Sequence, residues 1–254
     1  MRIAIVTGAS SGIGREFAKQ IPKVYKQLDE LWVVSRSTLK LESLKKEVSI
    51  PIRIFDGDMQ RDYIYERITR ELERQKADIR MLVNCAGYGK IGDFGSLDTE
   101  EQLGMINLNC RALTKLTKLC LPYLSKGSRI IQIASAAAFA PQPGFAVYAA
   151  TKSYVYSFSL ALRWELREKE ILVTAVCPGP VDTAFFERAE GDAGSTKEAL
   201  RVRPEEVVKK ALADSKKGKA VSVYGIPIKA ARAAAKFVPK DFAAMIMQMI
   251  NKRG

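Results

Sequence analysis

Residues 2–14 read RIAIVTGASSGIG, and this stretch decides the fold class. Residues 3–6 are apolar and β-branched, which indicates a buried strand, and a helical pattern follows the glycines. Glycines here let the backbone turn tightly and approach a pyrophosphate, while the helix N-terminus supplies N–H donors and positive potential. A purely structural turn is the alternative. The placement after a strand favours a dinucleotide-binding turn made by Gly8, Ser10, Ser11, Gly12, Ile13 and Gly14.

Short apolar runs alternate with helical patterns along the rest of the chain. We expect strands at 3–6, 31–35, 50–55, 81–84, 129–134, 172–177 and 220–223, and helices near 13–28, 37–48, 61–76, 98–124, 147–169 and 204–214. Runs that are apolar on both faces indicate a parallel sheet covered by helices on both sides. The sequence therefore predicts an α/β fold: a single-domain, doubly wound (Rossmann-type) parallel sheet of about seven strands.

Two segments depart from this alternation. Pro22 lies inside the first predicted helix and is expected to kink or end it, because proline costs about 3 kcal/mol in a helix interior. Residues 185–196 (FFERAEGDAGST) mix glycine, acidic and aromatic residues without periodicity, and we expect a mobile excursion there. We expect residues 1–225 to form a dinucleotide-binding catalytic domain, and 226–254 a basic amphipathic C-terminal extension of that domain.

The amino-acid composition limits which catalytic and metal-binding groups the chain can contain. The chain has 254 residues, four cysteines and no histidine. The missing histidine excludes Ser-His-Asp and Cys-His nucleophiles and His-ligated zinc. Acid–base chemistry near neutral pH must then come from a Tyr, Lys, Cys or carboxylate with a shifted pKa. The cysteines are widely spaced and form no CxxC pair, so no metal site is expected.

Charge and hydropathy bear on location and partners. The net charge is +13, and residues 201–254 hold 13 basic and 4 acidic side chains. Phe242, Met245, Ile246, Met249 and Ile250 form one apolar helical stripe in this basic region. Weak peripheral contact with an anionic membrane through 227–254 is one interpretation, and packing on the sheet or on a second subunit is the other. We expect no nucleic-acid partner, and a cytoplasmic protein because no signal peptide or long apolar run is seen.

The end of the second predicted strand indicates which dinucleotide binds. An acidic residue there would accept hydrogen bonds from the adenosine ribose and repel a 2′-phosphate. This chain has Ser35, Arg36 and Ser37 instead, which suit a phosphate and predict NADP(H). The alternative for Arg36 is a solvated surface arginine. Arg15, just past the glycine turn, fits either a phosphate contact or a helix-surface charge.

Three residues supply candidate acid–base chemistry. Tyr148 and Lys152 lie four apart and share one helix face. A phenol has a pKa of about 10, and a nearby ammonium would stabilise its anion. Ser135 ends the fifth predicted strand, where ligands bind in this architecture, and could hold a substrate carbonyl. The alternative is that Tyr148 and Lys152 are ordinary residues on a helix with no catalytic role.

Taken together, the motifs resemble those of the short-chain dehydrogenase/reductase family over nearly the whole chain up to about residue 225. They are TGASSGIG at 7–14, Asp58, NCAG at 84–87, Asn109, Ser135, Tyr148 with Lys152, and PGPVDT at 178–183. The resemblance implies a homodimer or homotetramer built through the helices at 98–124 and 147–169.

The resemblance also implies residue roles. Tyr148 would donate the proton in carbonyl reduction, Lys152 would bind the nicotinamide ribose and depress the Tyr148 pKa, and Ser135 would polarise the carbonyl. Asn109 would hold a water in a proton relay to Lys152, with Asn107 as the fallback. The remaining cofactor contacts would come from Asp58, Met59, Asn84, Ala86, Gly87, Pro178, Gly179, Val181 and Thr183. Cys85 departs from the usual Asn-Asn-Ala-Gly, and we expect it to pack.

The pocket composition predicts a lipophilic small-molecule substrate, a steroid, a fatty ketone or an aromatic ketone. The resemblance implies that its walls are Ala136, Phe139, Phe145, Phe185 and Phe186, with Tyr88 opposite. Several of these phenylalanines could instead belong to the core. The leading function is an NADP(H)-dependent oxidoreductase acting on ketones, aldehydes and alcohols. The alternatives are a non-catalytic NADP(H)-binding sensor and a membrane-associated accessory protein on the same fold.

Overall fold

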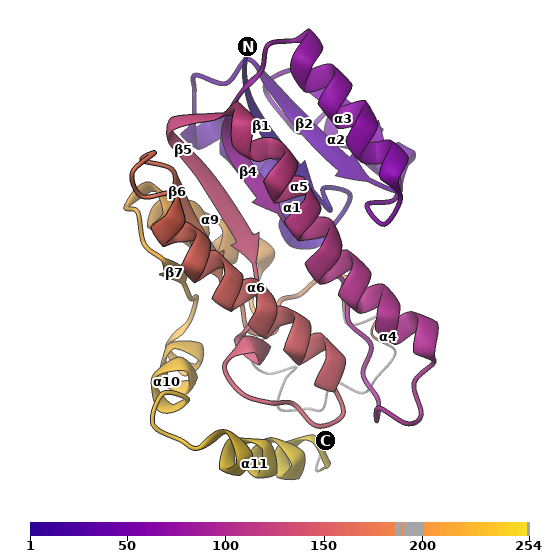
Figure 1. Cartoon of the computed structure of the whole chain (residues 1–254), viewed down its shortest axis with the longest axis vertical. Coiled ribbons are helices and arrows are strands. Elements are labelled where there is room, and N and C mark those ends of the chain that lie inside the picture. Colours follow the sequence, from indigo (N-terminus) through magenta and orange to yellow (C-terminus); the bar gives the residue numbers. More distant parts are fainter. Residues whose placement is uncertain (186–188, 190–200, 253–254) are drawn as a thin grey trace.

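The computed structural model describes residues 1–185, 189 and 201–252 (Figure 1). Its centre is a seven-stranded parallel sheet with the order β3-β2-β1-β4-β5-β6-β7. The strands are β1 (Arg2–Thr7), β2 (Glu30–Ser35), β3 (Ile52–Asp56), β4 (Asp78–Asn84), β5 (Leu124–Ile133), β6 (Leu172–Val176) and β7 (Val221–Ser222). The strand order changes direction between β1 and β4. In doubly wound sheets, ligands bind in the crevice at the carboxyl ends of the strands beside such a point. The predicted doubly wound sheet is confirmed.

Helices cover both faces of the sheet (Figure 1). On one face, α3 (Asp62–Arg74), α5 (Leu113–Cys120) and α6 (Ala146–Glu165) pack on a buried cluster that includes Ile5, Trp32 and Leu82. On the other face, α1 (Gly12–Val24), α2 (Thr38–Leu44) and α9 (Pro204–Lys216) pack on a cluster that includes Val6, Val33 and Val83. Alternate residues of one strand enter opposite clusters, as the strand period of two requires.

Several predicted helix boundaries were wrong. The first helix ends at Val24, two residues after Pro22, rather than at 28. The long helix expected at 98–124 is divided into α4 (Thr99–Ile106), a π-helical segment (Asn107–Ala112), α5 and a 3₁₀ turn (Leu121–Tyr123). Proline at the start of that 3₁₀ turn has no N–H to donate, and Leu124 already belongs to β5. Hydropathy alone does not distinguish π from α turns.

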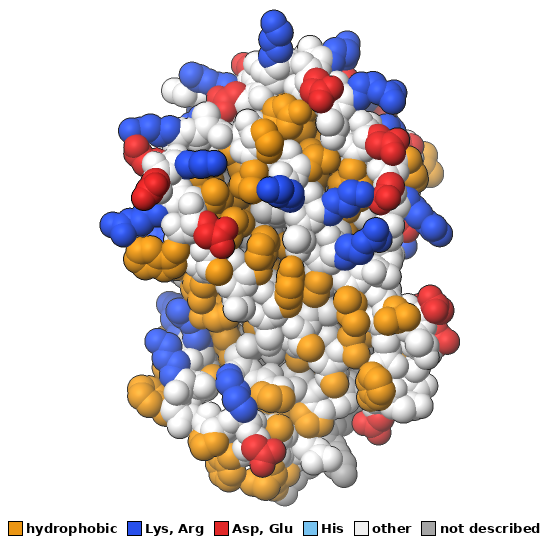
Figure 2. Space-filling view, in the orientation of Figure 1, with side chains coloured by type: hydrophobic (Ala, Val, Ile, Leu, Met, Phe, Trp, Pro, Cys, Tyr) orange, Lys and Arg blue, Asp and Glu red, His pale blue; other side chains and the backbone are white. Residues whose placement is uncertain are grey.

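The C-terminal segment forms two further helices, α10 (Ile226–Ala234) and α11 (Lys240–Lys252). Figure 1 shows them beyond β7, with α11 at the end of the molecule toward which the strands point. In Figure 2 charged side chains of both signs cover the upper part of this face, while hydrophobic side chains gather toward the lower end. Within the described residues, the structure contains no helix of sufficient length and hydropathy to cross a membrane.

Candidate active site

The glycine turn after β1 is held in the geometry that the sequence predicted. Gly8 and Gly12 adopt positive φ angles of 68° and 52°, which favour glycine. A Cβ on Gly14 would lie 2.3 Å from the Gly8 carbonyl oxygen, so only glycine lets α1 begin this close to β1. The N-cap Ser11 makes no side-chain capping bond, and the first turn of α1 has no acidic residue. The N–H groups of this helix end are therefore suited to an anion.

The end of β2 presents a cation beside this turn. The side-chain oxygen of Ser35 accepts a hydrogen bond from the Ser37 N–H at 3.2 Å, which shapes the turn into α2. Arg36 between them is exposed and makes no hydrogen bond or ion pair with any described residue. Arg15 is different, because its guanidinium donates to the Lys40 carbonyl at 2.9 Å and pairs with Glu47. Of the two interpretations of Arg15, the structure therefore favours a helix-surface charge.

The ends of β3 and β4 place the next predicted residues. Asp58 accepts a hydrogen bond from the Gln60 N–H at 2.9 Å. The Met59 side chain is buried in the core, so only its backbone is available to a nucleotide. Asn84 is buried and donates to Thr117 on α5 at 2.9 Å, so its side chain supports the sheet rather than lining the crevice.

The segment after β4 is fastened to the glycine turn. The Thr7 hydroxyl accepts hydrogen bonds from the N–H groups of Cys85 and Ala86, at 3.0 and 2.9 Å. A Cβ on Gly87 would lie 2.8 Å from Asn109 Oδ1, so this glycine allows the segment to approach Asn109. Cys85 packs as expected, and burial raises the pKa of its thiol to about 12. This thiol stays neutral near pH 7.

Tyr148, Lys152 and Ser135 come together at the carboxyl edge of the sheet. Tyr148 and Lys152 lie one turn apart on α6, and both are buried, at 7% and 6% exposure. The Lys152 ammonium donates to the Ile133 carbonyl at 2.9 Å and lies 5.6 Å from the centre of the Tyr148 ring. Ser135 caps the 3₁₀ turn at Ala136–Ala138 and hydrogen-bonds to the Tyr148 phenol. Helix α6 and the turn after β5 thus bring three polar side chains together.

Burial is the largest influence on the pKa values of Tyr148 and Lys152. It raises the pKa of Tyr148 to about 12, and the hydrogen bond from Ser135 lowers it in part. Burial likewise lowers the pKa of Lys152 to about 8. Both shifts follow from the cost of placing a charge in a medium of low polarity. In the protein without ligand, the phenol is therefore a neutral proton donor at pH 7, and Lys152 remains largely charged.

Asn109 occupies a buried position in the π-helical segment. Its side-chain oxygen accepts from the Tyr88 N–H at 3.1 Å, and its amide nitrogen donates to the Tyr88 carbonyl and the Thr151 hydroxyl at 2.9 and 3.0 Å. Asn107 is only half-buried. π-helical turns are frequent at functional sites because they redirect side chains. The Asn109 side chain thus joins the 87–89 segment to α6, and both of its N–H groups are engaged.

Aromatic rings surround the phenol. Phe145 stacks on Tyr148 with ring centres 4.2 Å apart, and Phe185 lies 5.5 Å from Tyr148. Phe139 instead packs edge-on against Tyr156 at 5.8 Å within the core, which was the alternative for some of these rings. Ala136 is half-buried beside the same core cluster. Phe186 lies outside the described residues.

The Tyr88 side chain points away from this ring cluster. Its hydroxyl donates to the Glu101 carbonyl on α4 at 3.0 Å. A Cβ on Gly104 would lie 2.2 Å from that hydroxyl. We expected Tyr88 opposite the pocket phenylalanines, and this contact directs its ring to α4.

The segment after β6 contacts both the loop after β5 and the glycine turn. The Pro178 carbonyl accepts a hydrogen bond from the Ala136 N–H at 2.8 Å, which joins this segment to the loop after β5. Gly179 faces α10, where a Cβ would lie 2.7 Å from Ile228 Cδ1. Val181 is buried and pairs with Val202. The Thr183 methyl group would lie 2.9 Å from a Cβ on Gly12, so this segment also reaches the glycine turn.

A family comparison adds to this geometry. The family model described as short chain dehydrogenase matches residues 2–193. The chain belongs to the short-chain dehydrogenase family. It is an oxidoreductase related to enzymes that act on CH–OH groups, and its seven-stranded fold agrees with theirs.

Individual relatives of this chain were found among curated proteins and solved structures. The chain is 33% identical over 223 residues to the oxidoreductase DltE of Bacillus subtilis, covering 85% of this chain and 84% of that one. It is 34% identical over 192 residues to a very-long-chain 3-oxoacyl-CoA reductase of Anas platyrhynchos, covering 71% of this chain and 60% of that one. A short-chain dehydrogenase from Sphingobium yanoikuyae, solved in complex with NADPH, superposes with a TM-score of 0.79 at 27% identity, and the match covers 93% of each chain.

Sequence reasoning missed two residues of the candidate site. Gly89 is buried against the aromatic rings, and a Cβ there would lie 2.7 Å from Tyr148 Cδ2 and 2.8 Å from Phe145 Cζ. Thr151 accepts from Asn109 and donates to the Tyr148 carbonyl at 2.7 Å. Gly89 gave only a weak signal, a second glycine two residues after Gly87. Thr151 gave none, because its role depends on contact with another helix.

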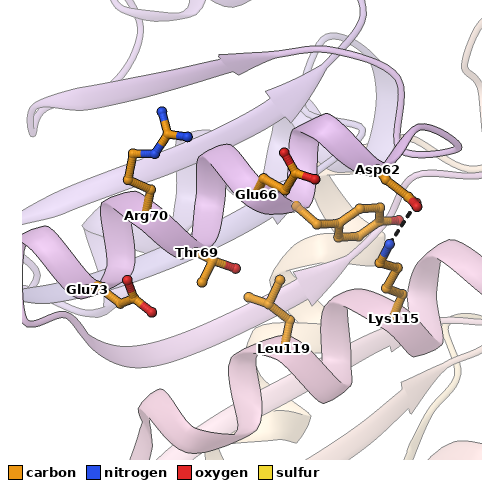
Figure 3. Close-up of a pocket in the computed structure, with 8 residues that line it drawn as sticks. Asp62, Glu66, Thr69, Arg70, Glu73, Lys115 and Leu119 are labelled. Atoms are coloured by element: carbon orange, nitrogen blue, oxygen red, sulfur yellow. Dashed lines mark hydrogen bonds and ion pairs between the residues drawn. The ribbon is translucent and has the colours of Figure 1, made fainter.

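A hollow of about 500 Å³ lies elsewhere on the dehydrogenase, between α3 and α5 (Figure 3). Its lining includes Asp62, Glu66, Arg70 and Lys115, and Asp62 and Lys115 form an ion pair at 2.7 Å. The hollow is open and is lined by residues of α3 and α5, not by the segments that follow β1, β4, β5 and β6. The group of Ser135, Tyr148 and Lys152 therefore remains the candidate active site.

Proposed function

We propose that this chain is an NADP(H)-dependent oxidoreductase that interconverts a ketone or aldehyde and the corresponding alcohol. The observation that carries the proposal is the buried phenol of Tyr148, which hydrogen-bonds with Ser135 and lies one helical turn from Lys152. A neutral phenol and a buried ammonium at the carboxyl edge suit proton transfer to an oxygen that gains negative charge.

The residues of the crevice fit a nicotinamide dinucleotide. Glycines 8, 12 and 14 leave room for close approach, and the uncapped start of α1 favours a pyrophosphate. The free guanidinium of Arg36, with Ser35 and Ser37, supports a 2′-phosphate and therefore NADP(H). Asp58 and the Met59 backbone would meet the adenine, while Ala86, Pro178 and Thr183 line the way to the nicotinamide end. When bound, the cofactor supplies or accepts the hydride.

Side chains of the protein would carry out the proton transfer. The Ser135 hydroxyl would hold the substrate oxygen next to the phenol. Tyr148 would give its proton to that oxygen during reduction, because burial keeps the phenol protonated at neutral pH. Lys152 carries a charge at pH 7 and would stabilise the phenolate left behind. Alcohol oxidation reverses these steps, with the Tyr148 phenolate accepting the proton.

The aromatic wall supports a lipophilic substrate. Phe145 and Phe185 flank the phenol with apolar surface, and Gly89 lets the Phe145 and Tyr148 rings pack directly against its backbone. Relatives at similar identity include a 17-beta-hydroxysteroid dehydrogenase type 3 of Danio rerio, 30% identical over 194 residues, of which the match covers 61%. Such names favour a steroid or fatty carbonyl compound over a small polar one.

Pairing of two copies through α4, α5 and α6 belongs to the same proposal. Leu103 and Ile106 on α4, and Tyr154 and Trp164 on α6, are large apolar side chains with exposures between 42% and 69%. Tyr154 and Thr114 hydrogen-bond at 2.8 Å, which joins α5 and α6 into one surface. A homodimer or homotetramer would cover these residues. Residues 1–225 would form the catalytic part, and 226–254 an extension of it.

The test is NADPH consumption over a panel of steroid, fatty and aromatic ketones. Tyr148→Phe is expected to lower kcat by about 10²- to 10⁴-fold, the usual contribution of a general acid, while NADPH binding measured by fluorescence stays near the native level. Phe145→Leu is a control for altered ring packing without loss of the hydroxyl. NADPH binding without turnover of any carbonyl compound by the native protein would instead support a cofactor-binding sensor.

A further inference from the structure

The C-terminal helices expose many large apolar side chains. Of the 15 large hydrophobic residues that are exposed in the described part of the chain, seven lie between 226 and 250. They are Ile226, Phe237, Phe242, Met245, Ile246, Met249 and Ile250, and we name them the C-terminal apolar surface. Ile226 and Phe237 are 81% and 86% exposed. So dense a group in a short segment is typical of a surface that contacts a partner or a membrane.

Helix α11 carries its larger side chains on the solvent side. Ala243, Ala244 and Met247 are half-buried and therefore face the rest of the protein. The five exposed apolar residues of α11 follow the spacing i, i+3, i+4, i+7 and i+8, so they form one continuous stripe on the opposite side. An ordinary surface helix has polar residues there. Burial against the protein therefore does not explain this composition.

The charges around this surface are almost all positive. Residues 226–254 contain six Lys and Arg side chains and one acidic side chain, Asp241. Lys229 and Lys236 are exposed and form no ion pair with any residue of the described chain. Figure 2 shows Lys and Arg side chains beside hydrophobic ones in the lower part of this face. The patch therefore complements an anionic surface that also accepts apolar groups.

Helices α10 and α11 also make hydrogen bonds and contacts with residues near the candidate active site. The Lys240 ammonium donates to the Phe139 carbonyl at 2.8 Å, and Arg232 donates to the Tyr156 hydroxyl at 3.5 Å. Ile228 contacts Gly179 in the segment after β6. These anchors hold the two helices at the carboxyl edge of the sheet, where Figure 1 shows α11. The apolar stripe is thus carried by a fixed part of the structure, on the same edge as Tyr148.

We propose that the C-terminal apolar surface docks on the surface of an anionic lipid bilayer. The apolar stripe of α11 enters the head-group boundary, and Lys229 and Lys236 contribute attraction to the lipid head groups. A second copy of the chain is a poorer occupant, because it would bring the same uncompensated positive charge to the contact. The proposal does not rest on the proposed function, because lipid binding needs no turnover.

The test is co-sedimentation of the full-length protein with vesicles of phosphatidylcholine alone or with one third phosphatidylglycerol. Native protein is expected to sediment with the anionic vesicles and much less with the neutral ones. The double variant Met245→Glu/Met249→Glu removes apolar area and adds repulsion, so binding should fall by at least about tenfold. Leu39→Glu, at an 84% exposed apolar residue on α2, is the matched control and should bind as the native protein does.

A second variant separates charge from apolar contact. Lys229→Glu/Lys236→Glu leaves the stripe intact and should weaken binding by about tenfold at low salt and less at high salt. Light scattering of the same proteins without lipid measures their mass. Failure of native protein to sediment with anionic vesicles overturns the proposal. So does a fall in mass of Met245→Glu/Met249→Glu with lipid binding retained, because a second copy would then cover the surface.

Discussion

The Lys152 ammonium lies 5.6 Å from the centre of the Tyr148 ring and is fixed there by a 2.9 Å hydrogen bond to the Ile133 carbonyl. The two groups are buried together, yet burial moves their pKa values in opposite directions, to about 12 for Tyr148 and about 8 for Lys152. The sequence predicted that Lys152 would depress the phenol pKa. In the protein without ligand the larger influence on both groups is the loss of water around them.

The first prediction concerns stability. The pKa of Lys152 is lower in the folded than in the unfolded chain, whose ordinary value is 10.5. The unfolded state therefore binds more protons between pH 8 and 10.5, and the lysine disfavours folding most below that range. We expect Lys152→Met to raise the free energy of unfolding at pH 7 by about 1–3 kcal/mol, with a smaller gain at pH 10. Urea unfolding at both pH values measures this, and an equal effect at both would contradict it.

The second prediction concerns the pH dependence of turnover. Lys152 loses its charge above about pH 8, and the stabilisation of the Tyr148 phenolate is lost with it. For carbonyl reduction we expect kcat/KM to decline above that pH. Lys152→Arg keeps the charge at all accessible pH values, so its lower activity should show a later alkaline decline. An identical alkaline decline in the two proteins would assign it to another group.

The third prediction tests the close packing around the phenol. Gly89→Ala places a methyl group 2.7 Å from Tyr148 Cδ2, so the ring must move. We expect kcat to fall by about 10- to 100-fold, because displacements near 1 Å cost this much in an aligned site. Gly95→Ala is the matched control, since a Cβ there meets nothing within 4 Å. Steady-state kinetics should give a much lower kcat for Gly89→Ala than for Gly95→Ala. Equal kcat values would show that close packing at Gly89 does not matter for catalysis.

The fourth prediction tests cofactor choice. Arg36→Ala removes a guanidinium that has no partner among the described residues, so the fold should be unaffected. We expect the Kd for NADP⁺ to rise about 10- to 100-fold, the value of one or two charge-assisted hydrogen bonds, with little change for NAD⁺. Lys46→Ala, at an exposed lysine that follows α2, is the control. Fluorescence titration gives both constants, and equal losses for the two dinucleotides would contradict a 2′-phosphate contact.

The fifth prediction separates the two asparagines of the π-helical segment. Asn109→Ala leaves the Tyr88 backbone and Thr151 without three hydrogen bonds in a buried place. We expect the free energy of unfolding to fall by about 2–4 kcal/mol. Asn107→Ala, at a half-buried neighbour, should cost under about 0.5 kcal/mol. Thermal or urea unfolding measures both losses. A larger loss for Asn107→Ala than for Asn109→Ala would make Asn107 the anchoring residue.

The sequence was informative where local chemistry dictates structure. Apolar runs predicted all seven strands, and the glycines at 8, 12 and 14 predicted a turn that the backbone angles require. It was less informative about the direction of side chains. Met59, Asn84 and Phe139 follow strands or turns that face the crevice, yet each side chain packs inward because neighbouring helices offer it a partner. Those partners come from distant parts of the chain.

The π-helical segment at Asn107–Ala112 has a consequence for the register of α5. A wide turn takes up one residue more than an α turn, so everything after it is rotated by about 100° relative to an unbroken helix. Leu116 and Cys120 point into the sheet only because of that extra residue. Deleting one residue from this segment would turn their buried face toward solvent, so the surplus amino acid keeps the later helix in phase with the strands beneath it.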